Sequence, residues 1–238
     1  MNRLYERKPL LHALLWILIY VMGSSVCQSL TGGKEFLPLF HAVLTAVLAF
    51  WICRRGLSGH FGLCRARYPA RRFLWYVPLI LIPCVNLAGG LRWNEPVRDS
   101  ILAALSMVFV GFLEEVIFRG LLFKALRPDG VRKAMVISAV TFGLGHIVNL
   151  FNNSGNTPLS TVLQVVYAMA LGFLFVVLFE RGGSLWGAIA VHSATNTLGV
   201  FASPALQGRP EILLSALLTA VAAGYAVYLL KRLPTPEE

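Results

Sequence analysis

Long apolar runs dominate this 238-residue chain and limit what it can fold into more than any other feature. A helix needs about 20 apolar residues to cross a bilayer core. Charged residues make up only 13% of the chain, whereas soluble domains carry about 25%. The pattern predicts an all-α polytopic membrane protein, a bundle of about eight transmembrane helices in a single domain over residues 1–238. The expected spans are residues 9–30, 36–53, 73–91, 100–126, 134–151, 160–179, 184–202 and 212–230.

Lys and Arg are distributed unevenly between the two sides of the membrane on which successive loops alternate. Of the 21 basic residues, four lie on one side and one, Arg119, lies inside a span. Cytoplasmic loops carry the excess of basic residues in membrane proteins. The distribution therefore predicts that both termini are cytoplasmic. It also places the net charge of +10 in membrane flanks, so we expect no nucleic-acid partner. The other sixteen basic residues lie in segments 1–8, 54–72, 124–133, 181 and 231–232.

The span at 100–126 carries three ionisable side chains within six positions: Glu114, Glu115 and Arg119. Each costs at least ~2.5 kcal/mol at the centre of a bilayer, so such groups persist where they face protein or a water-filled cavity. Glu115 and Arg119 are four residues apart and can pair on one helix face. Glu114 is turned away by ~100° and has no charged partner on its own helix. We expect a structural Glu115–Arg119 pair and a functional Glu114.

Two later spans each carry a histidine with a companion one helical turn away. Phe142 precedes His146, and Asn196 follows His192. Taken alone, His146 can be a satisfied core histidine, and the other pair can be a polar contact that joins helices. Counting residues from the span ends places Glu114, His146 and His192 between the midplane and the cytoplasmic side. We therefore expect the fourth, fifth and seventh spans to enclose one polar cavity.

The chemistry of these groups suits hydrolysis. A buried carboxylate with an imidazole beside it can activate water, and a second imidazole with an amide can donate to an oxyanion. Two histidines and a glutamate can also hold zinc with water as the fourth ligand, so this alternative stays open. Ser193 stands next to His192 but faces ~100° away on a helix, which argues against a serine nucleophile.

The ordered set Glu114-Glu115-xxx-Arg119, Phe142-xxx-His146 and His192-xxx-Asn196, on three separate spans, resembles the three motifs of the CPBP family. These are the CAAX prenyl protease and bacteriocin-processing (Abi) proteins, which include the type II CAAX prenyl endopeptidases. The resemblance covers about residues 100–200, which form the motif-bearing core. It implies an eight-helix intramembrane endopeptidase of the glutamic type, without a catalytic metal or another cofactor.

The resemblance also implies a role for each motif residue. Glu114 is expected to activate water and His146 to assist it. His192 and Asn196 are expected to stabilise the oxyanion. Supporting roles fall to Glu115, Arg119 and Phe142.

The substrate implied is a membrane-associated peptide or lipidated protein, cleaved near the cytoplasmic side of the bilayer. We expect a multi-pass protein of the plasma (inner) membrane of a prokaryote. Two other function classes stay open. One is a proton-coupled transporter, because intramembrane Glu, Arg and His also mark ion pathways. The other is a catalytically inactive membrane scaffold, in which the polar residues only lock the helices together.

Overall fold

The structure is a computed structural model, and it describes residues 2–31, 35–151 and 157–234. Helices account for nearly all of its regular structure, and the described residues contain no β-strand. The predicted all-α, polytopic class is therefore confirmed. The elements are α1 (Asn2–Arg7), α2 (Pro9–Thr31), α3 (Phe36–Arg54), η1 (Ala70–Tyr76), α4 (Val77–Cys84), η2 (Val85–Leu87), α5 (Val97–Glu115), η3 (Val116–Phe123), α6 (Lys124–Leu126), η4 (Arg127–Asp129), α7 (Val131–Gly145), η5 (His146–Leu150), α8 (Pro158–Gly182), α9 (Trp186–Val200), η6 (Pro204–Leu206) and α10 (Arg209–Arg232).

Seven helical stretches within the described residues are long and apolar enough to cross a membrane. The remaining predicted span, the seventh at 184–202, differs because its helix, α9, has only 15 residues. At 1.5 Å per residue it is about 22 Å long, shorter than a bilayer core of ~30 Å. This short helix packs against α4, α5 and α8 within the bundle. The arrangement remains a bundle of roughly eight helices.

The third predicted span, 73–91, is not one regular helix. The chain turns through η1, where Leu74, Trp75 and Tyr76 all have positive φ, between 51° and 59°. Helix α4 starts only after this turn and has eight residues. Pro78 lies in its first turn, where the missing N–H is tolerated because that donor has no helical partner. The predicted span is present among the seven candidate crossings, at Ala70–Leu87, but it is irregular at its start rather than one regular helix.

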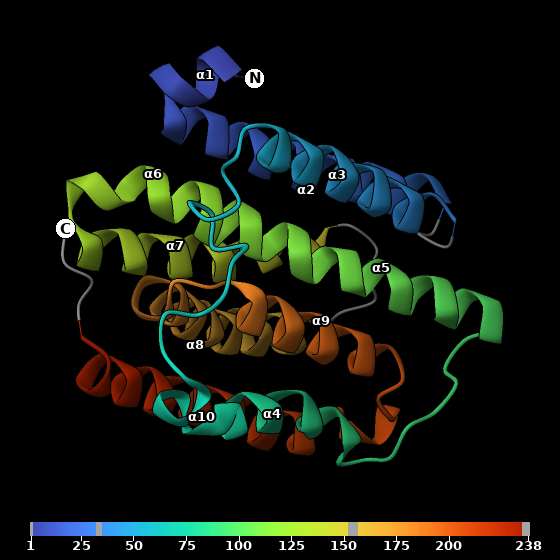
Figure 1. The fold of residues 1–238 in the computed structure, drawn as a ribbon. Coiled ribbons are helices and arrows are strands. Elements are labelled where there is room, and N and C mark those ends of the chain that lie inside the picture. The colour runs from blue at the N-terminus through green and yellow to red at the C-terminus, as the bar shows by residue number, and fades with distance from the viewer. Residues whose placement is uncertain (1, 32–34, 152–156, 235–238) are drawn as a thin grey trace.

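The helices run roughly along one direction, so the bundle has two ends (Figure 1). Helix α2 starts and α10 ends at the left edge of the view, where the loop at 55–69 also crosses the bundle. We call this edge the sealed end. The loops at 88–96 and 201–208 lie at the right edge, which we call the open end.

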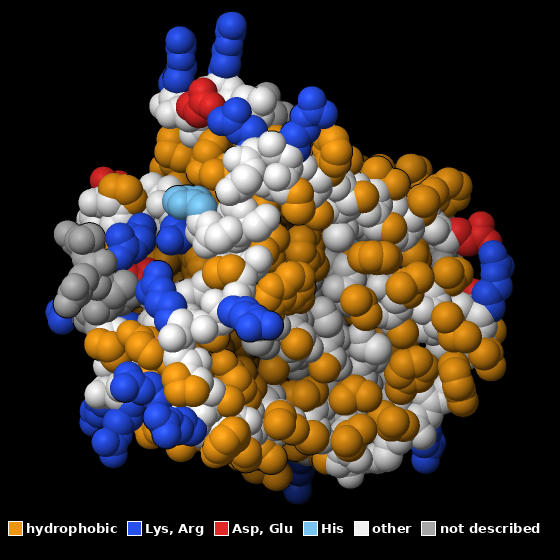
Figure 2. Space-filling view, in the orientation of Figure 1, with side chains coloured by type: hydrophobic (Ala, Val, Ile, Leu, Met, Phe, Trp, Pro, Cys, Tyr) orange, Lys and Arg blue, Asp and Glu red, His pale blue; other side chains and the backbone are white. Residues whose placement is uncertain are grey.

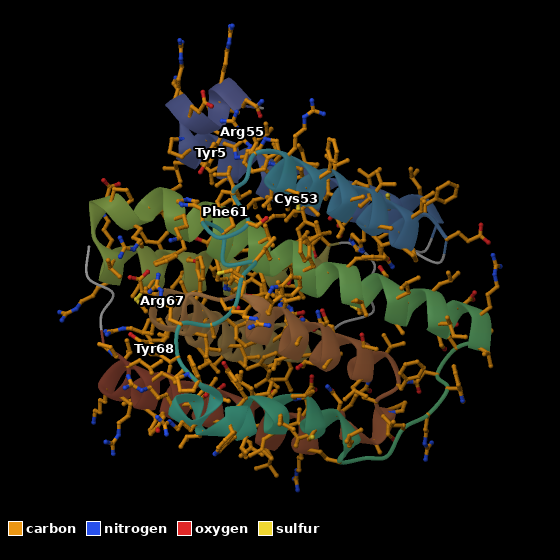
Figure 3. The ribbon with its side chains drawn as sticks, viewed as in Figure 1. Tyr5, Cys53, Arg55, Phe61, Arg67 and Tyr68 are labelled. Atoms are coloured by element: carbon orange, nitrogen blue, oxygen red, sulfur yellow. The ribbon has the colours of Figure 1, made fainter. Side chains whose placement is uncertain are left out.

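The loop at 55–69 is packed into the sealed end. Phe61 has an exposed fraction of 0% and meets the ring of Tyr5 edge-on, with centroids 5.9 Å apart (Figure 3). Leu185 lies on the segment that joins α8 to α9, and its amide donates to the Gly62 carbonyl at 2.8 Å. The Arg67 amide donates to the last residue of α8 at the same distance. The loop therefore closes this end with both apolar and backbone contacts.

Candidate active site

Glu114 and Glu115 are the last two residues of α5, and the backbone then widens into the π-helical turn η3. All eight residues of η3 are buried. Such turns are uncommon and occur frequently at functional sites. The sequence pattern, which predicts a regular α-helix here, did not indicate this turn.

Helix α9 approaches α5 closely just before the two glutamates. A Cβ at Gly111 would lie 2.7 Å from the backbone nitrogen of Ser193, so a side chain there would push the helices apart. The Ser193 hydroxyl donates to the Val108 carbonyl at 3.1 Å and joins the same two helices. This close approach of α9 to α5 places His192 within reach of both carboxylates. It also means that the Ser193 hydroxyl is used in a hydrogen bond between the two helices.

The predicted Glu115–Arg119 pair is present and buried. One guanidinium nitrogen donates to Glu115 Oε1 at 3.0 Å, and both side chains have an exposed fraction of 0%. The guanidinium also lies 4.1 Å from the centre of the Phe142 ring and 5.6 Å from that of Phe175. Aromatic faces attract a cation electrostatically. These rings compensate for guanidinium nitrogens that have no hydrogen-bond acceptor among the described residues.

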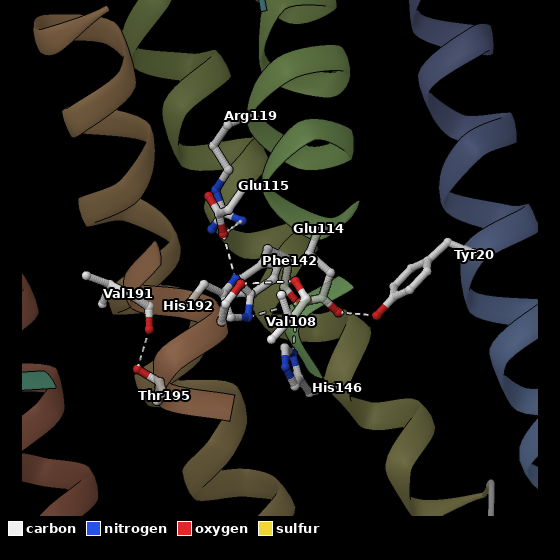
Figure 4. A network of polar contacts seen from close by, with 11 residues as sticks. Tyr20, Val108, Glu114, Glu115, Arg119, Phe142, His146, Val191, His192 and Thr195 are labelled. Carbon is white, nitrogen blue, oxygen red and sulfur yellow. Dashed lines mark hydrogen bonds and ion pairs between the residues drawn. The ribbon is translucent and has the colours of Figure 1, made fainter. Parts of the chain in front are cut away.

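His192 bridges the two carboxylates (Figure 4). Its Nδ1 lies 2.7 Å from Glu115 Oε1, and its Nε2 lies 3.3 Å from Glu114 Oε2. Both ring nitrogens are thus engaged by carboxylates. This geometry differs from the expectation that His192 donates to an oxyanion.

Glu114 has a second partner, which the sequence did not indicate. The Tyr20 hydroxyl, from α2, donates to Glu114 Oε1 at 2.6 Å (Figure 4). The Glu114 side chain is 12% exposed. A tyrosine inside an apolar span gives no periodic signal, and no motif marks the first three spans. Tyr20 was therefore missed.

His146 lies at the point where α7 ends and η5 begins. Its Nδ1 donates to the Phe142 carbonyl at 3.1 Å, since a carbonyl can only accept. This bond leaves Nε2 available for other contacts. The Phe142 ring lies edge-on to His146 and His192, with centroids 5.2 Å and 5.7 Å away. Phe142 therefore packs between the two imidazoles and under Arg119.

A cavity of about 1120 Å³ lies in front of several of the predicted site residues. Its walls include Glu114, His146 and the half-buried Asn196. His192, Glu115 and Arg119 do not line it and lie behind Glu114. His41 also lines the cavity, and its ring nitrogens contact the hydroxyls of Ser24 and Ser106 at 3.0 Å and 2.8 Å.

The direction of this cavity differs from the expectation. It begins at Glu114 and Phe118 and reaches Asn94 and Gln207, which lie on the loops of the open end. Residue counting predicts a polar layer on the side that holds the chain termini. The side chains do converge, but the space in front of them extends the other way.

No group of three or more His, Cys, Asp and Glu residues in the described part of the chain is placed to hold a metal ion. The structure thus offers zinc no ready-made set of ligands among these residues.

The fold and site define a polytopic helical membrane protein with a buried carboxylate–imidazole cluster. Residues 96–198, which carry all three motifs, match the family model described as type II CAAX prenyl endopeptidase Rce1-like. This match confirms the resemblance that the motifs indicate. The human protein named CAAX prenyl protease 2 is 28% identical over 148 residues.

That alignment covers 59% of this chain and 41% of the human protein. The chain therefore spans about two fifths of the length of this relative. The comparison with solved structures gave no significant match.

Proposed function

We propose that the protein is an intramembrane endopeptidase that hydrolyses a peptide bond of a membrane-associated or lipid-tethered substrate. One observation carries the proposal: the Glu114 carboxylate lies at the floor of a 1120 Å³ cavity within a bundle of apolar helices. The hydroxyl of Tyr20 and the ring of His192 hold it in place. The match to an endopeptidase family supports a peptide as the substrate.

In the proposed reaction, Glu114 takes a proton from a water molecule in the cavity. The resulting hydroxide attacks the carbonyl carbon of the peptide, and the electron pair of the C=O bond moves to oxygen. The tetrahedral intermediate then collapses, the C–N bond breaks, and the proton passes from Glu114 to the leaving nitrogen. The carboxylate is restored, as general acid–base catalysis requires.

The other residues take roles that follow from their contacts. His146 Nε2 is free for the attacking water, because Nδ1 is bonded to the Phe142 carbonyl. The Asn196 amide lines the cavity and can donate to the oxyanion. His192 is a positioning residue, because it holds Glu114 and is itself held by Glu115. Glu115 and Arg119 support this arrangement from behind Glu114, and Phe142 packs against both imidazoles.

The two other function classes receive less support. A transporter needs a path past Glu114, but every residue of η3, which follows the two glutamates, is buried. A scaffold needs the polar groups only to join helices, but Glu114 and Asn196 face a cavity. Location in the plasma membrane of a prokaryote stays a prediction, which membrane fractionation of the native cells tests.

The test is cleavage by purified protein in detergent, using fluorogenic peptides with and without a prenyl group. We expect Glu114→Gln to lower the rate by about 10³-fold, within the range for loss of an acid–base group. The control is Glu6→Gln, the same change at an exposed residue of α1, which should leave the rate unaltered. The unfolding temperature of Glu114→Gln should stay close to that of the wild type.

A Glu114→Gln rate within about tenfold of the wild type would contradict the mechanism. Cleavage that a chelator abolishes and zinc restores would favour the metal alternative. A wild type that cleaves none of the peptides but binds them would favour the scaffold.

A further inference from the structure

We propose that substrate reaches Glu114 from the extracytoplasmic face of the membrane, so that the enzyme acts on peptide segments presented on that face. This inference rests on the proposed function for the reaction itself. The side of access rests on three separate features: the direction of the cavity, the packing of the sealed end and the distribution of charge.

Among the described residues, the walls of the cavity lie toward one end of the bundle. Beyond Glu114 its walls come from the halves of the helices nearest the open end, such as the end of α2 and the start of α8. Its mouth is polar and includes Gln28, Asn94, Glu95 and Gln207. A hydrated peptide backbone can exchange its hydrogen bonds with water for bonds to such side chains.

The sealed end is closed by side-chain packing and hydrogen bonds among the described residues. The cavity beside Phe73 and Ser184 there has a volume of about 20 Å³, close to that of one water molecule. The Ser184 hydroxyl donates to the Cys64 carbonyl at 2.7 Å and fixes the loop at 55–69 to the start of α9. Arg127 forms hydrogen bonds to both carboxylate oxygens of Glu180, at 3.0 to 3.3 Å. A peptide cannot enter here without breaking these contacts.

Charge then assigns the two ends to the two sides of the membrane. Sixteen of the 20 basic residues outside the spans gather at the sealed end, in segments 1–8, 54–72, 124–133, 181 and 231–232. Figure 2 shows Lys and Arg concentrated over this edge and few at the opposite edge. Basic flanks stay in the cytoplasm. The sealed end is therefore cytoplasmic and the cavity mouth is extracytoplasmic.

This placement restricts the substrate. A lipidated peptide confined to the cytoplasmic leaflet would meet the sealed end. A peptide that has already crossed the membrane, or is anchored in the outer leaflet, would meet the cavity mouth. The class of substrate that fits is thus an exported or outward-facing peptide segment.

The side of the cavity mouth can be measured without any activity. The four native cysteines are first replaced by alanine. Two single-cysteine variants are then made in this background, one with Gln207→Cys and the other with Gly59→Cys. Gln207 is exposed and lines the mouth. Gly59 is exposed in the loop at the sealed end, and a Cβ there would meet nothing within 4 Å. Intact spheroplasts are treated with a membrane-impermeant maleimide, and each cysteine is also labelled after permeabilisation.

We expect Gln207→Cys to be labelled fully in intact spheroplasts and Gly59→Cys only after permeabilisation. The reverse pattern would overturn the inference, and so would labelling of both or of neither in intact spheroplasts. The result is independent of catalysis: a chain labelled as expected that cleaves no added peptide would refute the proposed function and leave the side of the cavity standing.

Discussion

At the sealed end, polar side chains pair with one another across helices; at the open end, they surround a cavity. The carboxylate of Glu180 is bound by Arg127 in two places. Glu114 instead has a tyrosine hydroxyl on one oxygen, a histidine near the other, and the cavity in front. The comparison shows how one bundle uses the same residue type for two purposes. A fully paired carboxylate stabilises the fold, and a partly paired one stays available for a reaction.

Glu115 lies on the boundary between these two purposes, and its removal should have the largest effect on stability. Glu115→Ala leaves Arg119 buried without its partner, which typically costs about 3–5 kcal/mol of unfolding free energy. We expect most of the purified protein to be aggregated or unfolded, as measured by size-exclusion chromatography and thermal unfolding in detergent. A monodisperse variant with wild-type unfolding temperature would show that the pair is dispensable.

Phe61 tests the sealed end alone. Phe61→Ala removes a fully buried ring and should lower the unfolding free energy by about 3 kcal/mol, at the low end for such truncations. Cleavage per folded molecule should be unchanged, because Phe61 does not line the cavity. Loss of activity without loss of stability would mean that the loop at 55–69 takes part in the reaction.

Tyr20 tests the open end alone. Tyr20→Phe removes the hydrogen bond to Glu114 Oε1, and bonds to charged groups contribute about 1.5–3 kcal/mol. We therefore expect the unfolding free energy to fall by up to that amount and the cleavage rate to fall by about 10- to 100-fold. An unaltered rate would show that Glu114 does not depend on α2 for its position.

Ser193 should show the smallest effect. Ser193→Ala removes one hydroxyl bond between α5 and α9 and should lower the unfolding free energy by about 1 kcal/mol. Cleavage should persist, because water rather than this hydroxyl is the proposed nucleophile. Complete loss of cleavage in a folded Ser193→Ala variant would instead point to a covalent serine mechanism.

Several features of the fold and the candidate site followed from the sequence. The apolar runs gave the class and most of the spans, because bilayer thickness fixes how many apolar residues a helix needs. The spacing of four between Glu115 and Arg119 predicted their pair, because residues that far apart meet on one helix face. The same helical geometry predicted that Glu114 points away from Glu115 and Arg119. The catalytic roles of these residues stay predictions.

Other features depend on packing that spacing does not encode. Tyr20 and Phe175 reach the cluster from helices without motifs, so their sequence context is ordinary. The π-helical turn and the break at Leu74 leave no mark on the apolar pattern of their spans. Counting residues gave an approximate depth for Glu114, but it could not show toward which end of the bundle the space in front of it extends.

The most direct test of the account is cleavage before and after a bulky maleimide is attached to the single cysteine of Gln207→Cys in detergent. We expect this modification at the mouth to abolish cleavage, whereas the same modification of Gly59→Cys leaves the cleavage rate unchanged. Continued cleavage after complete modification of Gln207→Cys would contradict the claim that peptides reach Glu114 through this cavity.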